Sequence, residues 1–147
     1  MEFDTVVKLA IYRTIAETAR APTSDDLARE LRSSPDAVEA AFRALRAKRL
    51  LVPEPGDPSR IRMAPPFSGI ETPFLVRVGT KAYFANCVWD ALGIPAALHR
   101  DAIVEASDGE TGDPMTLEVR DGKPTPRECA IHFAVPAARW WDDIIYT

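Results

Sequence analysis

The two cysteines of the chain and one nearby aspartate are the residues best suited to chemistry. Cys87 stands three residues before Asp90, where a strand-like segment gives way to a helix-like one. A helix N-terminus stabilises a thiolate through its partial positive charge and free amides, so Cys87 is a candidate nucleophile or soft-metal ligand. Asp90 would lie on the same helical face and could exchange a proton with whatever the sulfur binds. The alternative is a buried cysteine acting as a small hydrophobe, beside an aspartate that stabilises the first helical turn.

The second cysteine belongs to a segment, residues 128–135, whose alternation is typical of a strand. On a strand, Cys129 would face an apolar layer, whereas Glu128 and His132 would point to the opposite face. The Cys-x-x-His spacing lacks the second pair of ligands of a structural zinc site, so we expect no zinc here. We interpret His132, and also His99, as structural histidines.

Aromatic and acidic residues near these segments are further candidates. We interpret Trp89, Trp140 and Trp141 as core residues or as walls of a substrate pocket, because large aromatic rings dominate burial in small domains. Asp142 and Asp143 follow the last two tryptophans. They could bind a metal or lie in a solvated turn, and both alternatives stay open.

Composition limits the class of protein. The chain has 147 residues, 46% of them hydrophobic, which suits one compact domain or two very small ones. A net charge of -4 and a pI near 5.2 argue against general attraction to phosphate backbones, so nucleic acid is not expected as a partner. We find no signal peptide and no apolar stretch of about 20 residues, so no membrane is expected. Two cysteines in such a chain predict reduced thiols and a cytoplasmic location.

The first half of the sequence predicts three helices and a hairpin. Helices are expected over residues 3–20, from the capping residues 23–26 to about 33, and over residues 35–48 with Ser34 as the cap. Short strands at 50–52 and 61–63 flank a turn-rich segment. This order resembles a winged helix-turn-helix over about residues 5–65. In a DNA-binding version the third helix enters the major groove. Asp36 and Glu39 occupy its N-terminal end here, which favours a structural role or a homodimer contact instead.

The second half predicts a sheet with few helices. Paired prolines and a glycine at residues 64–69 predict a boundary between a winged-helix-like unit, 1–65, and a second domain, 66–147. Strands are expected at 74–78, 81–85, 102–106, 115–119 and 128–135, helices at 88–98 and 136–141, and a turn at 121–124. The predicted fold class is therefore α+β, with a mixed or antiparallel sheet after the N-terminal helices.

Three segments resemble a known family. Residues 83–95, with the sequence YFANCVWDALGIP, resemble the active-site segment of the organomercurial (alkylmercury) lyase family. Residues 129–136, CAIHFAVP, and 140–144, WWDDI, resemble its later segments in the same order. The family also begins with a winged-helix-like unit, so the resemblance spans most of the chain.

The resemblance implies protonolysis of a carbon–mercury bond. Two thiolates coordinate mercury, and an aspartate passes a proton to the departing carbon. Sulfur is soft and matches mercury, and added thiolate density makes the bonded carbon more basic. By this resemblance Cys87 is the first thiolate, Asp90 the proton carrier and Cys129 the candidate second thiolate. Mercury is then substrate and product, no cofactor is expected, and external thiols serve as acceptors.

The register of the second thiolate leaves an alternative open. Aligned on His132 and Phe133, the family's catalytic second cysteine falls on Glu128, and Cys129 falls on an accessory cysteine. A one-residue slip on a strand sends a side chain to the opposite face. Either Cys129 substitutes through a local bulge, or the thiolate pair is incomplete and the protein is a degenerate lyase.

Other functions are also compatible with the sequence. The chain could be a non-catalytic binder of a small organometallic or soft-metal ligand, or a metal-responsive DNA-binding regulator that uses its winged-helix unit. It could also be a relative recruited to unrelated small-molecule chemistry. The chain ends in an apolar, strand-forming run at residues 144–147. Termini are usually loose and solvated, so we expect the natural product to continue beyond this run.

Overall fold

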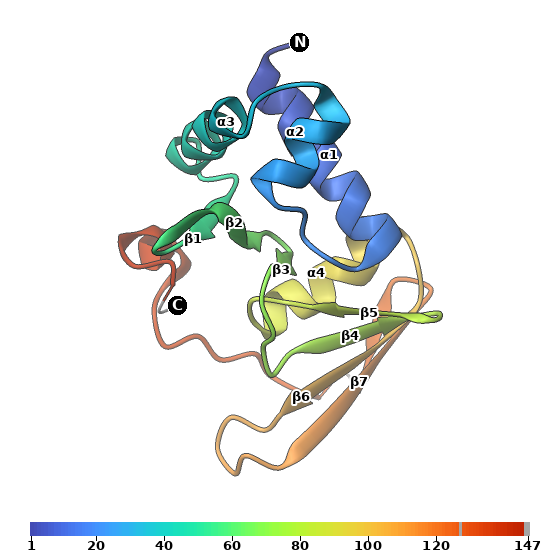
Figure 1. The fold of residues 1–147 in the computed structure, drawn as a ribbon. Coiled ribbons are helices and arrows are strands. Elements are labelled where there is room, and N and C mark those ends of the chain that lie inside the picture. The colour runs from blue at the N-terminus through green and yellow to red at the C-terminus, as the bar shows by residue number, and fades with distance from the viewer. Residues whose placement is uncertain (127, 146–147) are drawn as a thin grey trace.

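The N-terminal half consists of three helices and a small sheet (Figure 1). The computed structural model describes residues 1–126 and 128–145. The helices are α1 (Phe3–Thr18), α2 (Ser24–Leu31) and α3 (Pro35–Ala47). The strands β1 (Val52–Glu54), β2 (Asp57–Ala64) and β3 (Phe67–Ser68) form an antiparallel sheet in the order β1-β2-β3. The predicted order of three helices followed by a hairpin is thus confirmed, with a third strand added.

Side-chain caps define where the second and third helices begin. Thr23 and Asp26 form a capping box, in which the Asp26 amide donates to Thr23 Oγ1 (3.2 Å) and the Thr23 amide donates to Asp26 Oδ2 (3.0 Å). Ser34 Oγ accepts from the Ala37 amide (3.2 Å), and Pro35 occupies the first turn. These caps satisfy amides that a helix leaves without partners, which is why the predicted starts were accurate.

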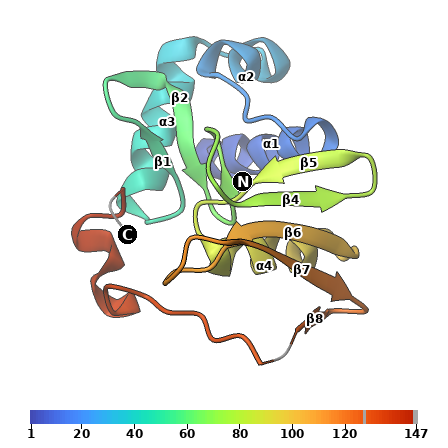
Figure 2. The ribbon, with the colours of Figure 1, turned by 90° about the horizontal axis from the view of Figure 1, so that it is seen from below.

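The second half contains an antiparallel sheet with an α-helix packed on it. The strands β4 (Leu75–Val78), β5 (Lys81–Phe84), β6 (Ala102–Ser107), β7 (Pro114–Arg120) and β8 (Lys123–Thr125) have the order β5-β4-β6-β7-β8. Helix α4 (Val88–Leu98) packs against β4, β6 and β3, and Figure 2 shows it along one face of the sheet. The α+β fold class predicted from the sequence is confirmed.

The core runs through both halves. Ile11 and Phe42 from the N-terminal helices are buried in the same cluster as Val76 and Val104 of the second sheet. Strand β3 pairs with β2 directly after Pro65 and Pro66, at the predicted boundary. The division into domains at residue 65 stays a prediction.

The packing of α4 favours a glycine at position 93. A Cβ atom on Gly93 would approach the Cβ of Pro66 to 3.2 Å, closer than ordinary side-chain contacts. Gly93 therefore lets α4 lie against the segment that joins β2 to β3. This contact joins the middle of α4 to the connection between β2 and β3.

The prediction of a strand at residues 128–135 is wrong. Residues 128–136 form neither helix nor strand, and the sheet ends at β8. Instead, Phe133 packs on Trp89 and Trp140, and Trp140 Nε1 donates to the Val135 carbonyl oxygen (2.8 Å). These aromatic contacts outweigh the β-propensity of the segment and draw it away from the sheet.

Smaller differences from the prediction concern the C-terminal part. The turn expected at residues 121–124 is confined to Asp121 and Gly122, both with positive φ, because β8 pairs with β7 from Lys123 onward. The final helix is a 3₁₀ helix, η1 (Ala137–Asp142). Figure 2 shows this C-terminal segment returning from β8 towards β1 and α3. The end of the predicted apolar run, Tyr146 and Thr147, lies outside the described residues.

Over residues 1–126 and 128–145, no helix has the length and apolarity to cross a membrane.

Candidate active site

A cavity of about 590 Å³ opens between the first turn of α4 and the C-terminal segment. This volume is in the range of small-molecule sites. Most of its wall is apolar or aromatic, and its polar side chains are Asn86, Cys87 and Asp90 at the β5–α4 junction together with Arg49 and His132. The lining residues are Arg49, Met63, Pro65, Phe74, Asn86, Cys87, Val88, Trp89, Asp90, His132, Phe133, Ala134, Trp140, Trp141, Ile144 and Ile145.

Cys87 is the N-cap residue of α4, as the sequence predicted. The cysteine is partly buried and free of any disulfide. Burial raises the pKa of its thiol, the backbone amides of Asp90 and Trp89 lower it, and the charge of Asp90 raises it further. The net pKa is raised, so the effect of the helix N-terminus is present but outweighed by desolvation. The Cys87 thiol therefore holds its proton more firmly than an exposed cysteine does.

Asp90 lies in the first turn of α4 and lines the same cavity. Its Oδ2 accepts a hydrogen bond from Asn86 Nδ2 (2.8 Å). Burial raises the pKa of the Asp90 carboxyl, while the bond from Asn86 acts in the opposite direction. A carboxyl with a raised pKa can hold a proton closer to neutral pH than an exposed one. Cys87 and Asp90 thus form a thiol and carboxyl pair on one helical turn.

The N-terminal unit contributes to the surroundings of Asp90. Tyr12 of α1 donates a hydrogen bond to the Pro65 carbonyl oxygen (2.7 Å), and its ring meets that of Phe67 edge-on, with centroids 6.3 Å apart. Burial, followed by the charge of Asp90, raises the pKa of Tyr12 to about 12. The phenol is therefore neutral and adds no negative charge beside the carboxyl.

Aromatic rings form one wall of the cavity. Trp89 is 57% exposed and Phe133 is 37% exposed, and their ring centroids lie 6.4 Å apart in an edge-on arrangement. Phe133 also packs against Trp140, with centroids 5.0 Å apart. The guanidinium of Arg46 lies 5.1 Å from the ring centroid of Trp141, a cation–π contact between α3 and η1. Of the two interpretations of the three tryptophans, core residues or pocket walls, their place in the cavity lining agrees with the second.

The second predicted thiol lies elsewhere. Cys129 and Glu128 are exposed, and neither lines the cavity. His132 does line it, from the irregular segment rather than from a sheet. Asp142 is bound to Arg139 (3.1 Å), in agreement with a solvated turn. Within the described ranges, no three His, Cys, Asp or Glu side chains are grouped to hold a metal ion.

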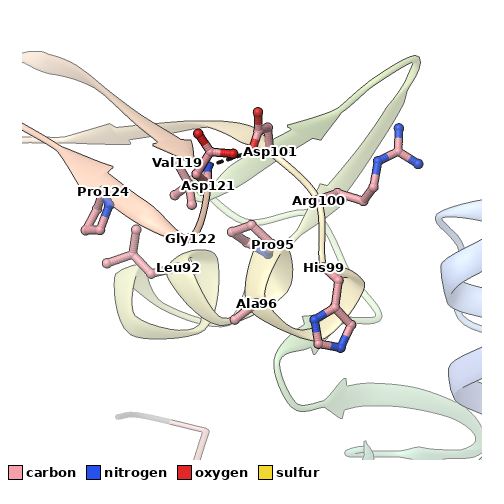
Figure 3. A pocket seen from close by; sticks show the side chains of 10 residues that line it. All are labelled: Leu92, Pro95, Ala96, His99, Arg100, Asp101, Val119, Asp121, Gly122 and Pro124. Atoms are coloured by element: carbon pink, nitrogen blue, oxygen red, sulfur yellow. Dashed lines mark hydrogen bonds between the residues drawn. The ribbon is translucent and has the colours of Figure 1, made fainter.

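A second cavity, of about 350 Å³, lies between the C-terminal half of α4 and the β7–β8 hairpin (Figure 3). His99 and Asp101 line it, and the Asp121 amide donates to Asp101 Oδ1 (2.9 Å). Arg100 extends away from the other labelled side chains in Figure 3. The lining residues of this second cavity include no cysteine, so the cavity offers no sulfur nucleophile.

Asn86 is a site residue that the sequence reasoning missed. It precedes Cys87, and its spacing of four residues from Asp90 would have indicated a contact on a helix. The helix begins only at Val88, but the Asn86 and Asp90 side chains still form a hydrogen bond.

Comparison with known proteins identifies the family. The family model described as alkylmercury lyase (MerB) matches residues 67–147, more than half of the chain. The chain belongs to the alkylmercury lyase family. The match includes Cys87, Asp90 and Cys129. A search of curated proteins gave no match.

A solved structure has a similar fold. The crystal structure of the mercury-bound form of MerB2 is similar to this chain with a TM-score of 0.62 and 24% sequence identity. The likeness covers 85% of this chain and 66% of that chain. It supports the α+β fold, and the alkylmercury lyase assignment rests on the family match.

Proposed function

We propose that this member of the alkylmercury lyase family captures an organomercurial on Cys87 and cleaves its carbon–mercury bond by protonolysis. The observation that carries the proposal is the placement of Cys87 and Asp90 on the first turn of α4, facing one aromatic-walled cavity. Burial raises the pKa of both groups. A thiol that carries its proton and a carboxyl able to accept one are suited to a proton relay.

The reaction balances in two steps. In the first, mercury of R–Hg–X bonds to the Cys87 sulfur, X leaves as an anion, and the thiol proton passes to the Asp90 carboxylate. In the second, Asp90 gives that proton to the carbon. The electron pair of the carbon–mercury bond becomes the new carbon–hydrogen bond, so R–H departs while mercury stays divalent and bound to sulfur. Soft mercury favours sulfur over the carboxylate oxygen that is left beside it.

A second sulfur ligand is assigned to a small thiol from solution. Cys129 as the second thiolate stays a prediction from the sequence, and its exposed position outside the cavity wall does not support it. A small thiol reaching Cys87 through the open cavity would add electron density to mercury and then carry the product away. Release then depends on external thiol.

The test is hydrocarbon release. Purified protein is incubated with phenylmercury and excess small thiol, and benzene is measured by gas chromatography. We expect release by the wild type and by Cys129→Ser, and none above background by Cys87→Ser or Asp90→Asn. Wild-type release equal to that of Cys87→Ser refutes the proposal, and loss of release in Cys129→Ser refutes the assignment of the second ligand.

A non-catalytic soft-metal binder is the second candidate. It is favoured by the single cysteine in the cavity lining, because capture needs one sulfur whereas the family resemblance implies two. Mass spectrometry that finds phenylmercury on Cys87, without benzene release, would select this function.

DNA binding has less support. Glu39 of α3 accepts a hydrogen bond from the buried Ser24 hydroxyl (3.3 Å), so this acidic residue is part of the helix packing. Lys48 is paired with Asp4 (2.6 Å) and Glu2 (3.3 Å). These pairs neutralise a cation that a phosphate backbone would need.

A further inference from the structure

Asn86 occupies a rigid position between β5 and α4. The residue before it, Ala85, forms an isolated bridge with Phe67, and the Ala85 amide donates to the Phe74 carbonyl oxygen (2.9 Å). The Ala85 carbonyl oxygen accepts from Thr72 Oγ1 (2.6 Å). The backbone that carries Asn86 is therefore held from both sides, and its side chain starts from a fixed point.

The Asn86 amide group donates to two acceptors. Nδ2 lies 2.8 Å from Asp90 Oδ2 and 3.3 Å from the Phe67 carbonyl oxygen. Both amide hydrogens are thus used, one on each partner. A rotation of the amide by half a turn would place its oxygen against two acceptors, which is repulsive. The contacts therefore fix the orientation of the amide.

The oxygen end of the Asn86 amide differs from the nitrogen end in its hydrogen bonding. Asn86 Oδ1 is buried and has no hydrogen-bond partner within the part of the chain that the structure describes. An unpaired buried acceptor is costly and uncommon in folded proteins. A leucine of similar size would avoid this cost, so packing alone does not account for asparagine at this position.

We infer that Asn86 is a positioning residue that fixes the Asp90 carboxyl within the cavity, and this inference rests on the proposed proton transfer. The bond to Oδ2 anchors one carboxyl oxygen to the β3 backbone through the amide. Oδ1 of Asp90 is left to take the proton from Cys87 and to pass it to carbon. Asn86 acts only through Asp90 and forms no bond to mercury.

The orientation can be measured without any mercurial. Three-bond Hα–Hβ couplings of Asp90, recorded by NMR on the full chain, report whether its side chain holds one rotamer. We expect one rotamer in the wild type and rotamer averaging in Asn86→Leu and Asn86→Ala, which both lack the donor. The matched control is Ser59→Ala, which removes a part-buried side-chain hydrogen bond to Asp57 within β2 and leaves the contacts of Asn86 and Asp90 in place. A single Asp90 rotamer in both Asn86 variants, or averaging in Ser59→Ala as well, overturns the inference.

The rate of benzene release provides a second test of the role of Asn86. Loss of a hydrogen bond to a charged group predicts roughly ten-fold slower benzene release in Asn86→Leu. The final extent of phenylmercury capture on Cys87 should be unchanged, because it depends on the sulfur–mercury bond and not on which group accepts the thiol proton. A final extent of capture that falls together with release would indicate a merely structural role and contradict the inference, as would unchanged release. If the wild type releases no benzene, the proposed function fails, while the Asp90 couplings still decide whether Asn86 positions the carboxyl.

Discussion

Replacing Tyr12 by phenylalanine tests how the N-terminal unit supports the site. The change deletes the hydroxyl that donates to the Pro65 carbonyl oxygen (2.7 Å) and keeps the ring that packs on Phe67. At neutral pH the loss of one hydrogen bond predicts a free energy of unfolding lower by about 1 kcal/mol. Measuring the free energy of unfolding at alkaline pH as well then separates the contribution of this hydrogen bond from the effect of burying the phenol.

The alkaline effect follows from the pKa of Tyr12. Burial raises that pKa from 10.0 to about 12 in the folded protein. Below the unfolded pKa both states are protonated and stability is unaffected. As the pH rises towards the folded pKa, the unfolded chain ionises first and stability is lost. A difference of about two pH units corresponds to a ceiling of about 2.7 kcal/mol, of which about 1.3 kcal/mol falls between about pH 9 and about pH 11. Partial exposure of the ring reduces this figure.

Urea unfolding of both proteins at these two pH values measures the effect. The other tyrosines titrate in both proteins, so subtraction isolates Tyr12. The wild type should be about 1 kcal/mol more stable than Tyr12→Phe near pH 9, and this advantage should vanish or reverse near about pH 11. A stability difference that stays constant across this pH range refutes the burial of the phenol between α1 and β3.

Three further predictions concern the site and the helix caps. Asp90→Asn should raise the free energy of unfolding at pH 7. The raised carboxyl pKa gives stability that is present at low pH and lost as the pH rises through the folded pKa, so the gain should disappear in acid, as urea midpoints would show. Phe133→Leu should lower capture of phenylmercury relative to methylmercury by about two- to ten-fold in competition mass spectrometry, since the aromatic wall loses a ring, and an unchanged ratio would contradict this role. Thr23→Ala should cost about 1 kcal/mol in urea unfolding by removing the capping box, and a neutral effect would show that the cap contributes nothing.

Local chemistry explains which elements the sequence could predict. The Ser34 cap and the Thr23 capping box mark where α3 and α2 begin, because each side-chain oxygen accepts a hydrogen bond from a backbone amide of its own segment. The helix over residues 88–98 was predicted with the observed bounds despite Gly93 and Pro95. Gly79, with positive φ, allowed the β4–β5 hairpin to be placed.

Long-range contacts explain what the sequence could not predict. Residues 128–135 carry the apolar alternation of a strand, but the contact of Phe133 with Trp89 joins positions 44 residues apart and leads the chain out of the sheet. The pairing of Cys87 with Asp90 is local to one helical turn and was predicted correctly as a juxtaposition. The contact of Tyr12 with the Pro65 carbonyl and the walls of the cavity depend on tertiary packing, which has no signal in spacing.

The irregular course of residues 128–135 also changes how the position of the second thiol should be judged. The choice between Glu128 and Cys129 mattered because neighbouring residues on a strand point to opposite faces. Residues 128–135 have no ladder of hydrogen bonds, so a shift of one residue there does not exchange faces. Cys129 lies three residues before His132, which lines the cavity, and three residues of chain span at most about 11 Å. What separates the two sulfurs is therefore the course of a segment held by aromatic contacts rather than a strand register. Hydrocarbon release by Cys129→Ser consequently tests the second ligand more directly than any alignment of the two positions.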